Sequence, residues 1–322
     1  MKKLSRVLCI VDPTASNHYA MERAASLCSK SGATLDLLIC CYNEYLGGQR
    51  FFDSPSLEKA RKQLMEEHLQ YLEALARPLQ EAGIEVAIAI HWDRPLHEGI
   101  ARYAATINAD LVIKDTHFHS AISNTLMGNT DWQLIRCCAA PLWLVKPVSM
   151  PDRPIFLSAL DPMNEHDKPA ALDDEILISA KKIADLYGGE VHAFHAYDPR
   201  AALATVTANA YLPVSLPYDE IEQQMREDHG RRLFEITKYH SIADDHTHLV
   251  AGRTEEELSL LASKLNAAVV VMGAIARTRL KRLFIGSTAE RTLDRLPCDL
   301  LIIKPDWFRT PAAILHHREA AA

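Results

Sequence analysis

The sequence lacks a long apolar run, an excess of positive charge and a paired cysteine motif, and each absence excludes a class of protein. No run approaches the ~20 apolar residues that a membrane helix needs, and the apolar stretch after the first lysines is too short for a signal peptide. The formal net charge of -7 opposes non-specific binding to nucleic acid, which requires a basic surface. We therefore expect a cytoplasmic protein with no membrane span and no DNA or RNA partner.

The seven cysteines form no C-x-x-C motif, and they lie within apolar segments. Reduced cytosolic cysteines behave in this way, as small hydrophobic residues rather than as a disulfide framework. Three catalytic signatures are also missing: the Walker G-x-x-x-x-G-K-[ST] loop, the G-x-G-x-x-G fingerprint and the G-x-S-x-G nucleophile elbow. The sequence therefore assigns no catalytic residue.

What the sequence does contain is a repeat. NADLVIK at 108–114 aligns with NAAVVVM at 266–272, and PLWLVKP at 141–147 aligns with DLLIIKP at 299–305. Both pairs are separated by 158 residues, a domain-length spacing far above the ~20–50 residues of a solenoid repeat. The chain is therefore expected to hold two copies of one domain.

The two copies meet in PVSMPDRP at 147–154, where three prolines disfavour helix and central strand. We place one domain at 1–148, the second at 153–306 and a flexible tail at 307–322. Short apolar runs alternate in each half with segments of helical periodicity. The predicted strands are 7–11, 35–41, 86–91, 110–114, 142–146, 155–160, 190–196, 246–251, 268–272 and 299–303. This alternation indicates an α/β fold with two open, five-stranded parallel sheets, each covered on both faces.

Ligands of such sheets bind beyond the carboxyl ends of the strands, where the strand order reverses. In the second half Gly273 ends the fourth strand, and Gly286-Ser287-Thr288 begins a helical segment. Glycine lets a ligand approach the backbone closely, and the free N–H groups and positive dipole of a helix start attract phosphate. Arg277 and three further cations lie between the two elements. An N-capped helix after a solvated basic loop is the alternative interpretation.

An aspartate ends the first strand of each half, at Asp12 and Asp161. A carboxylate there can accept hydrogen bonds from an amino group or a ribose hydroxyl. Together with the glycine-spaced loop, the segments HWDRP (91–95), TDWQLIRC (130–137) and TAERTLDRLPCDLLIIKPD (288–306) resemble the universal stress protein family, especially its tandem, two-domain members. The resemblance extends over both halves of the chain.

The resemblance implies a Rossmann-like, adenine-nucleotide-binding fold and a role in the stress response. The implied ligand is ATP or a related adenine nucleotide, accompanied by Mg²⁺. In this family the last strands pair across a dimer, so the two halves are expected to form a pseudo-twofold dimer within one chain. A further homodimer of the whole chain is left open.

The resemblance also gives roles to residues of the second half. The aspartate would contact adenine or ribose, residues 273–277 would flank the phosphates, and residues 286–288 would donate hydrogen bonds to them. The residues expected to bind nucleotide are Asp161, Gly273, Ala276, Arg277, Gly286, Ser287 and Thr288. Ala276 departs from the family pattern, which has a second glycine there, and its methyl group would crowd a close phosphate.

The first half departs further from the pattern. Asp115 and Phe118 stand where the second half has Gly273 and Ala276, and residues 119–127 contain no Lys or Arg. A carboxylate repels phosphate, and a phenyl ring fills the space that phosphate needs. The first domain is therefore expected to have lost nucleotide binding.

Two histidines raise the question of a metal. His117 and His119 lie two residues apart in a loop, but zinc needs three or four converging ligands. Solvated loop histidines are therefore the favoured interpretation, with a Zn²⁺ site as the weaker alternative. His192 and His195 lie in or near a strand and are interpreted as packed or hydrogen-bonded. No metal ligand is assigned.

The segment 197–220 is unusually apolar for a connection and follows the second strand of the second half. Long loops at this end of a sheet often line ligand sites, so the phosphate-bearing ligand could carry an apolar portion. Packing of the loop against the other domain or a second chain is an equal alternative. Three functions remain open: nucleotide binding in the stress response, a scaffold with vestigial nucleotide binding, and slow ATP hydrolysis.

Overall fold

The structure is a computed structural model of the chain, and it divides into two compact units. One unit consists of Met1–Met150 and Asp306–Ala322, and the other of Pro151–Pro305. The structure describes residues 4–46, 55–116, 129–163, 172–201, 204, 217–274 and 295–315.

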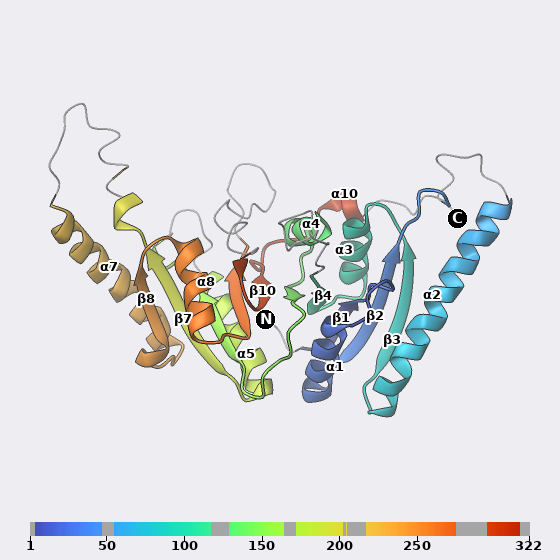
Figure 1. Cartoon of the computed structure of the whole chain (residues 1–322), viewed down its shortest axis with the longest axis horizontal. Coiled ribbons are helices and arrows are strands. Elements are labelled where there is room, and N and C mark those ends of the chain that lie inside the picture. The colour runs from blue at the N-terminus through green and yellow to red at the C-terminus, as the bar shows by residue number, and fades with distance from the viewer. Residues whose placement is uncertain are drawn as a thin grey trace. The chain divides into compact units, whose positions relative to one another are not determined.

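In the first unit strands and helices alternate (Figure 1). Its described elements are β1 (Arg6–Ile10), α1 (Tyr19–Ser31), β2 (Thr34–Cys41), α2 (Pro55–Glu81), β3 (Val86–Trp92), α3 (Leu96–Thr106), β4 (Leu111–Asp115), α4 (Asn129–Cys137), β5 (Leu142–Val145) and α10 (Ala312–Leu315). The second unit repeats the alternation. Its described elements are β6 (Ile155–Ala159), α5 (Leu172–Tyr187), β7 (Glu190–Tyr197), α7 (Tyr218–Tyr239), the 3-10 turn η1 (Asp244–His246), β8 (Thr247–Ala251), α8 (Thr254–Lys264), β9 (Val269–Gly273) and β10 (Asp299–Ile303).

The sheet has the same topology in each unit. The strand order is β3-β2-β1-β4-β5 in the first unit and β8-β7-β6-β9-β10 in the second. All of these neighbouring strands run parallel. The predicted pair of open, five-stranded parallel sheets is thus confirmed. The pseudo-twofold dimer of the two halves stays a prediction.

The central strands are buried because most of their side chains are apolar on both faces. Leu35, Leu37, Leu38 and Ile39 of β2 are all 0% exposed, as is Trp143 of β5. Removing such a side chain from water stabilises the fold by roughly 1.5–3 kcal/mol. These interiors hold the strand ends, and therefore the residues that follow them, at fixed places. The longest helices, α2 and α7, carry many charged residues, and no helix in the described ranges has the length and apolar character needed to cross a bilayer.

The prediction of a flexible tail from residue 307 is wrong for the residues up to 315. Phe308, Thr310 and Ile314 are buried in the first unit at 6%, 6% and 7% exposure. Ala139 N donates to Thr310 Oγ1 (3.3 Å), and Arg102 Nε donates to Ile314 O (2.8 Å). Two apolar anchors and two hydrogen bonds hold this segment, including α10, on the first unit.

All seven cysteines are free, as expected for reduced thiols. Burial raises the pKa of the Cys28 and Cys40 thiols to about 12 and that of Cys41 to about 11. Because the thiolate is the reactive form, burial disfavours reactivity at these three cysteines.

Candidate functional site

In the second unit the strand order reverses at β6 and β9. The strand β6 pairs in parallel with β7 on one side and with β9 on the other. Open α/β sheets bind their ligands at the carboxyl ends of strands at such a point. Asp161 follows β6 closely and Gly273 is the last residue of β9. The structure therefore brings these two predicted site residues to one edge of the sheet.

Asp161 is held at this edge by backbone hydrogen bonds. Leu160 N donates to Phe194 O (2.9 Å), which extends the pairing of β6 with β7, and Asp161 N donates to Asp173 Oδ1 (3.3 Å). Asp173 is buried in the first turn of α5, where the helix dipole favours a carboxylate. Two carboxylates at one edge can accept hydrogen bonds from hydroxyl and amino groups.

Gly273 lies against the start of α5. A Cβ at this position would stand 2.6 Å from Leu172 Cδ2 and 3.2 Å from Ile176 Cδ1. Both side chains are 1% exposed, so neither can move into solvent. Packing between β9 and α5 therefore already requires glycine here, whether or not a phosphate approaches the same backbone.

A histidine pair that the sequence did not reveal lies beside Asp161. His195 of β7 has its Nδ1 3.0 Å from Leu160 O and its Nε2 2.7 Å from Nδ1 of His229 in α7. A carbonyl oxygen only accepts, so His195 donates through Nδ1, and its neutral Nε2 accepts a hydrogen bond from His229. The sequence interpretation of His195 as a hydrogen-bonded histidine agrees with these contacts.

Burial lowers the pKa of both histidines, and Asp161 opposes the shift in each. For His195 the hydrogen bond to Leu160 O also opposes it, whereas His229 adds to it. The Tyr197 ring, at the end of β7, lies 5.4 Å from the His229 ring. The carboxyl end of β7 thus extends the site with neutral imidazoles and an aromatic ring. The sequence offered one signal for this pair, namely His195 two residues before the apolar segment 197–220. Its partner on α7, His229, could not be identified from the spacing of residues.

The other predicted nucleotide residues lie outside the described residues. They are Ala276, Arg277, Gly286, Ser287 and Thr288. The metal candidates His117 and His119, and most of the segment 197–220, also lie outside.

In the first unit the matching edge is occupied by the chain's own groups. Asp115 stands at the position equivalent to Gly273, and its Oδ1 accepts a hydrogen bond from Ala20 N (2.8 Å) at the start of α1. Beside it, the buried Lys114 Nζ donates to Asp115 O (2.8 Å) and lies 2.9 Å from Asp131 Oδ1. The two groups that could attract phosphate here are the start of α1 and Lys114. Both already interact with a carboxylate, of Asp115 and Asp131 respectively.

Among the described residues, one group of three side chains could converge on a metal ion: Glu190, His192 and His246. It lies where β7 begins and where η1 leads into β8, away from the carboxyl ends of the strands.

Comparison with known proteins identifies relatives along nearly the whole chain. The profile of the universal stress protein family matches residues 3–146 and 171–304. Universal stress protein E of Photorhabdus laumondii subsp. laumondii is 27% identical over 313 residues, covering 97% of this chain and 98% of the relative. Universal stress protein E of Escherichia coli (strain K12) is 27% identical over 315 residues, covering 98% of each chain.

Solved structures give the same result for the fold. A putative universal stress protein from Pseudomonas aeruginosa UCBPP-PA14 is similar with a TM-score of 0.68 and 25% identity, covering 94% of each chain. A universal stress protein from Archaeoglobus fulgidus DSM 4304 has a TM-score of 0.63 at 17% identity, covering 94% of this chain and 99% of its own.

Proposed function

Because the chain belongs to the universal stress protein family, with one family domain in each half, we propose that its second unit binds ATP or a related adenine nucleotide at the carboxyl ends of β6 and β9. Membership of this family makes the chain a stress-response protein. The proposal concerns what the second unit recognises.

The contrast between the two matching edges carries the proposal. In the first unit the Asp115 carboxylate accepts a hydrogen bond from Ala20 N at the start of α1. In the second unit the equivalent residue is Gly273, which adds no charge, and Asp161 follows the end of the neighbouring strand β6. The two repeats have the same strand order, but only the second has no acidic side chain at this strand end.

Each proposed contact follows from the chemistry of the residue. Asp161 accepts hydrogen bonds from the adenine amino group or a ribose hydroxyl. Arg277 neutralises phosphate charge, while Gly286, Ser287 and Thr288 donate N–H and O–H groups at a helix start. Mg²⁺ supplies further positive charge to the phosphates when it accompanies the nucleotide.

The test is titration of the full chain with a fluorescent ATP analogue, comparing Asp161→Ala with Asp12→Ala. These residues end the first strand of each unit, so they are matched in place and chemistry. We expect Asp161→Ala to weaken binding by about 10–100-fold, the typical loss for a hydrogen bond to a charged group. Asp12→Ala should bind as the wild type does. The opposite result would move the site to the first unit.

One observation favours a second function, a scaffold with vestigial nucleotide binding. Packing against Leu172 and Ile176 is sufficient to explain Gly273, so the glycine does not by itself indicate a ligand. Native mass spectrometry of freshly purified chain separates the two functions. A co-purified nucleotide, lost in the double variant Arg277→Ala/Ser287→Ala, would support binding, whereas an unliganded chain with no affinity for added ATP would support the scaffold. Phosphate release followed in the same samples would reveal slow hydrolysis.

A further inference from the structure

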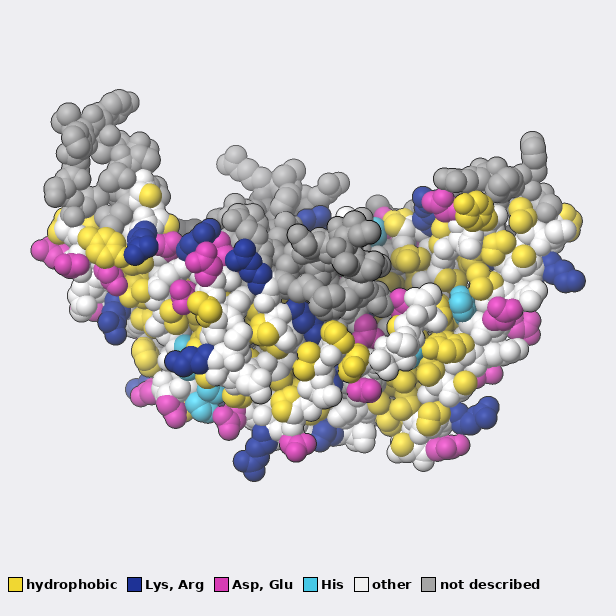
Figure 2. All heavy atoms as spheres, in the orientation of Figure 1, with side chains coloured by type: hydrophobic (Ala, Val, Ile, Leu, Met, Phe, Trp, Pro, Cys, Tyr) yellow, Lys and Arg dark blue, Asp and Glu magenta, His cyan; other side chains and the backbone are white. Residues whose placement is uncertain are grey.

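A compact polar cluster lies at the amino end of β7 and β8. Glu190 is the first residue of β7, and His192 follows two residues later on the same face of the sheet. His246 ends η1 and His248 is the second residue of β8, so they too are two residues apart. Three histidines and one carboxylate thus converge from β7, η1 and β8. Figure 2 shows histidine side chains beside acidic ones at the lower edge of this unit.

A glycine turn sets the place of the carboxylate. Gly189 precedes β7, and a Cβ there would stand 2.3 Å from Pro154 O, so only glycine fits. Glu190 N donates to the same Pro154 O (3.0 Å). The start of β7 is thereby fixed against the start of β6, and the position of Glu190 at the sheet end is defined.

The spacing of the ligand atoms is close to that of a zinc site. Glu190 Oε2 lies 3.7 Å from His192 Nε2 and 3.7 Å from His246 Nε2, and all three atoms lie within 4.8 Å of one another. Two ligand atoms on a tetrahedral zinc ion stand ~3.4 Å apart, because each Zn–N or Zn–O bond is ~2.1 Å long. Small side-chain movements therefore bring the three atoms to one ion.

One of those movements is a rotation of His246. The rings of His192 and His246 are stacked, with centroids 4.0 Å apart and planes 16° from parallel. Parallel rings cannot direct both lone pairs to one point, so the His246 ring has to turn toward His192 and Glu190. Its side chain is 29% exposed and has room to do so, whereas His192 is fixed.

The second nitrogen of His192 fixes its orientation. His192 Nδ1 lies 2.9 Å from Nε2 of His248, so the two imidazoles share a hydrogen bond. Metal-binding histidines commonly donate their other ring N–H to such a partner. When His192 donates through Nδ1, its Nε2 is unprotonated and carries a lone pair that can bind a metal ion. That atom is buried, has no hydrogen-bond partner within the described structure, and faces Glu190 and His246.

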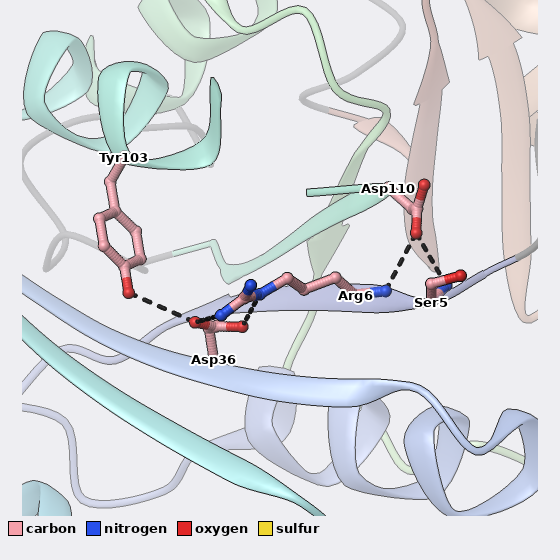
Figure 3. A network of polar contacts seen from close by, with 5 residues as sticks. All are labelled: Ser5, Arg6, Asp36, Tyr103 and Asp110. Carbon is pink, nitrogen blue, oxygen red and sulfur yellow. Dashed lines mark hydrogen bonds and ion pairs between the residues drawn. The ribbon is translucent and has the colours of Figure 1, made fainter. Parts of the chain in front are cut away.

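In the first unit, charged side chains of the chain itself pair with one another at the equivalent end of the sheet (Figure 3). Arg6 pairs with Thr34 in the sheet as Ile155 pairs with Glu190, which makes Asp36 equivalent to His192. Asp36 is 0% exposed and accepts hydrogen bonds from Arg6 Nε (2.7 Å) and Nη2 (3.1 Å).

Further hydrogen bonds are made to Asp36 and to the neighbouring Asp110 at this end of the sheet. Tyr103 OH donates to Asp36 Oδ1 (3.3 Å), and the nearby Asp110 Oδ2 accepts from Ser5 N (2.7 Å) and Arg6 N (3.0 Å). The chain's own guanidinium thus neutralises the buried acid. In the second unit Ile155 takes the place of Arg6, so β6 supplies no cation beside His192 and Glu190.

We propose that Glu190, His192 and His246 bind a Zn²⁺ ion, with water completing the tetrahedron and His248 orienting His192. Imidazole and carboxylate are the ligand types that zinc accepts, and the half-exposed Glu190 leaves the ion accessible from solvent. Since η1 leads directly into β8, the edge strand of this sheet, the ion would join the start of that strand to β7 and stabilise the second unit. This site is independent of the proposed nucleotide site at the opposite ends of the strands.

The test uses the full chain with any polyhistidine tag removed, because a tag binds zinc. Metal-stripped protein is titrated with Zn²⁺ by calorimetry, and thermal unfolding is followed with and without the ion. We expect one Zn²⁺ per chain and a raised melting temperature. His192→Ala and Glu190→Gln should each weaken affinity by about 100-fold or more, since loss of an outer partner of a ligand already costs ~10–100-fold. The control His240→Ala, which removes a histidine paired with Asp174 (2.6 Å), should keep wild-type affinity.

Two results would overturn the proposal. One is a wild-type chain that binds no Zn²⁺, or binds it no more tightly than both ligand variants. The other is loss of binding in the double variant His117→Ala/His119→Ala with His192→Ala unaffected, which would place the ion in the first unit. Should His192→Ala fail to fold, Glu190→Gln keeps the test decisive, because the Glu190 side chain is 51% exposed and its substitution leaves the core intact.

Discussion

Gly273 and Leu172 show how one residue can satisfy a structural demand and a functional one at once. The glycine ends β9 at the proposed phosphate edge, yet its lack of a side chain is already required by the buried leucine of α5. A ligand that approaches this backbone would use a space that packing has kept open. The consequence is that substitutions of Gly273 are expected to lower the stability of the fold, whether or not a ligand binds there.

Gly273→Ala should lower the free energy of unfolding by roughly 1–3 kcal/mol, the usual cost of overpacking a core. Urea unfolding followed by far-UV circular dichroism measures this change. In a Leu172→Ala background the added methyl group has room, so the same substitution should cost much less. An equal cost in both backgrounds would show that the clash with Leu172 is not the cause.

At this scale the sequence predicts what a residue can do but not what it touches. The acidic character of Asp115 predicts that the first unit does not bind phosphate, but the hydrogen-bond donor to its side chain, Ala20 N, is distant in sequence. Likewise, Gly273 could be placed at a strand end from the apolar run before it, whereas its contact with Leu172 depends on how α5 crosses the sheet. His229 was missed for the same reason.

At the scale of elements, β7 and α7 are joined by the hydrogen bond between His195 and His229. Burial lowers the pKa of both side chains below the unfolded value of 6.5. Protonation therefore favours the unfolded state. The contribution of the pair to stability is fully present above about pH 6.5 and is lost as the pH falls below it.

The free energy of unfolding should therefore fall between about pH 7.5 and pH 5.5, and this pair should contribute to the decrease. His229→Phe removes one of the two titrating groups, so its pH dependence should be shallower than that of the wild type. Chemical denaturation at a series of pH values measures both profiles. Parallel profiles would mean that the pair does not couple folding to protonation.

Strand positions were predictable because most strands contain a short apolar run, and 299–303 coincides with β10. The short helix α10 was not. Four residues after Pro311 are too few for a helical period, and the contacts that hold the segment come from Arg102 and Ala139, far away in sequence. Local sequence patterns therefore predict the strands of the sheet, whereas contacts between residues distant in sequence determine that 306–315 packs on the first unit.

At the scale of the whole molecule, the two repeats keep one strand order but differ at the strand ends. The buried interior of a parallel sheet accepts little besides apolar side chains, so both copies retain it. The ends are less constrained. There Arg6 and Asp36 of one copy correspond to Ile155 and His192 of the other, and Asp115 corresponds to Gly273. Duplication has thus produced two similar frameworks with different chemistry at both edges.

Deletion of residues 306–322 should destabilise the first unit, although the deletion lies at the far end of the chain. Loss of the buried Phe308 and Ile314 alone corresponds to roughly 3–6 kcal/mol. Tryptophan fluorescence during urea unfolding reports this unit specifically, because all four tryptophans (92, 132, 143 and 307) belong to it and the deletion, which removes Trp307, leaves the other three.

The matched control is deletion of 316–322 only, which keeps every described contact of the segment and should unfold close to the wild type. A deletion of 306–322 that leaves the fluorescence transition in place would show that these contacts add nothing to stability.

The return of residues 306–315 to the first unit also orders events during protein synthesis. The five strands of that unit leave the ribosome first, but α10 and the buried Phe308 arrive only after the whole second unit has been made. At ribosomal speeds of ~5–20 residues per second, this delay is on the order of ten seconds. The earliest part of the chain is therefore completed last, and a nascent chain that stalls within its second half carries a first half still lacking its final helix.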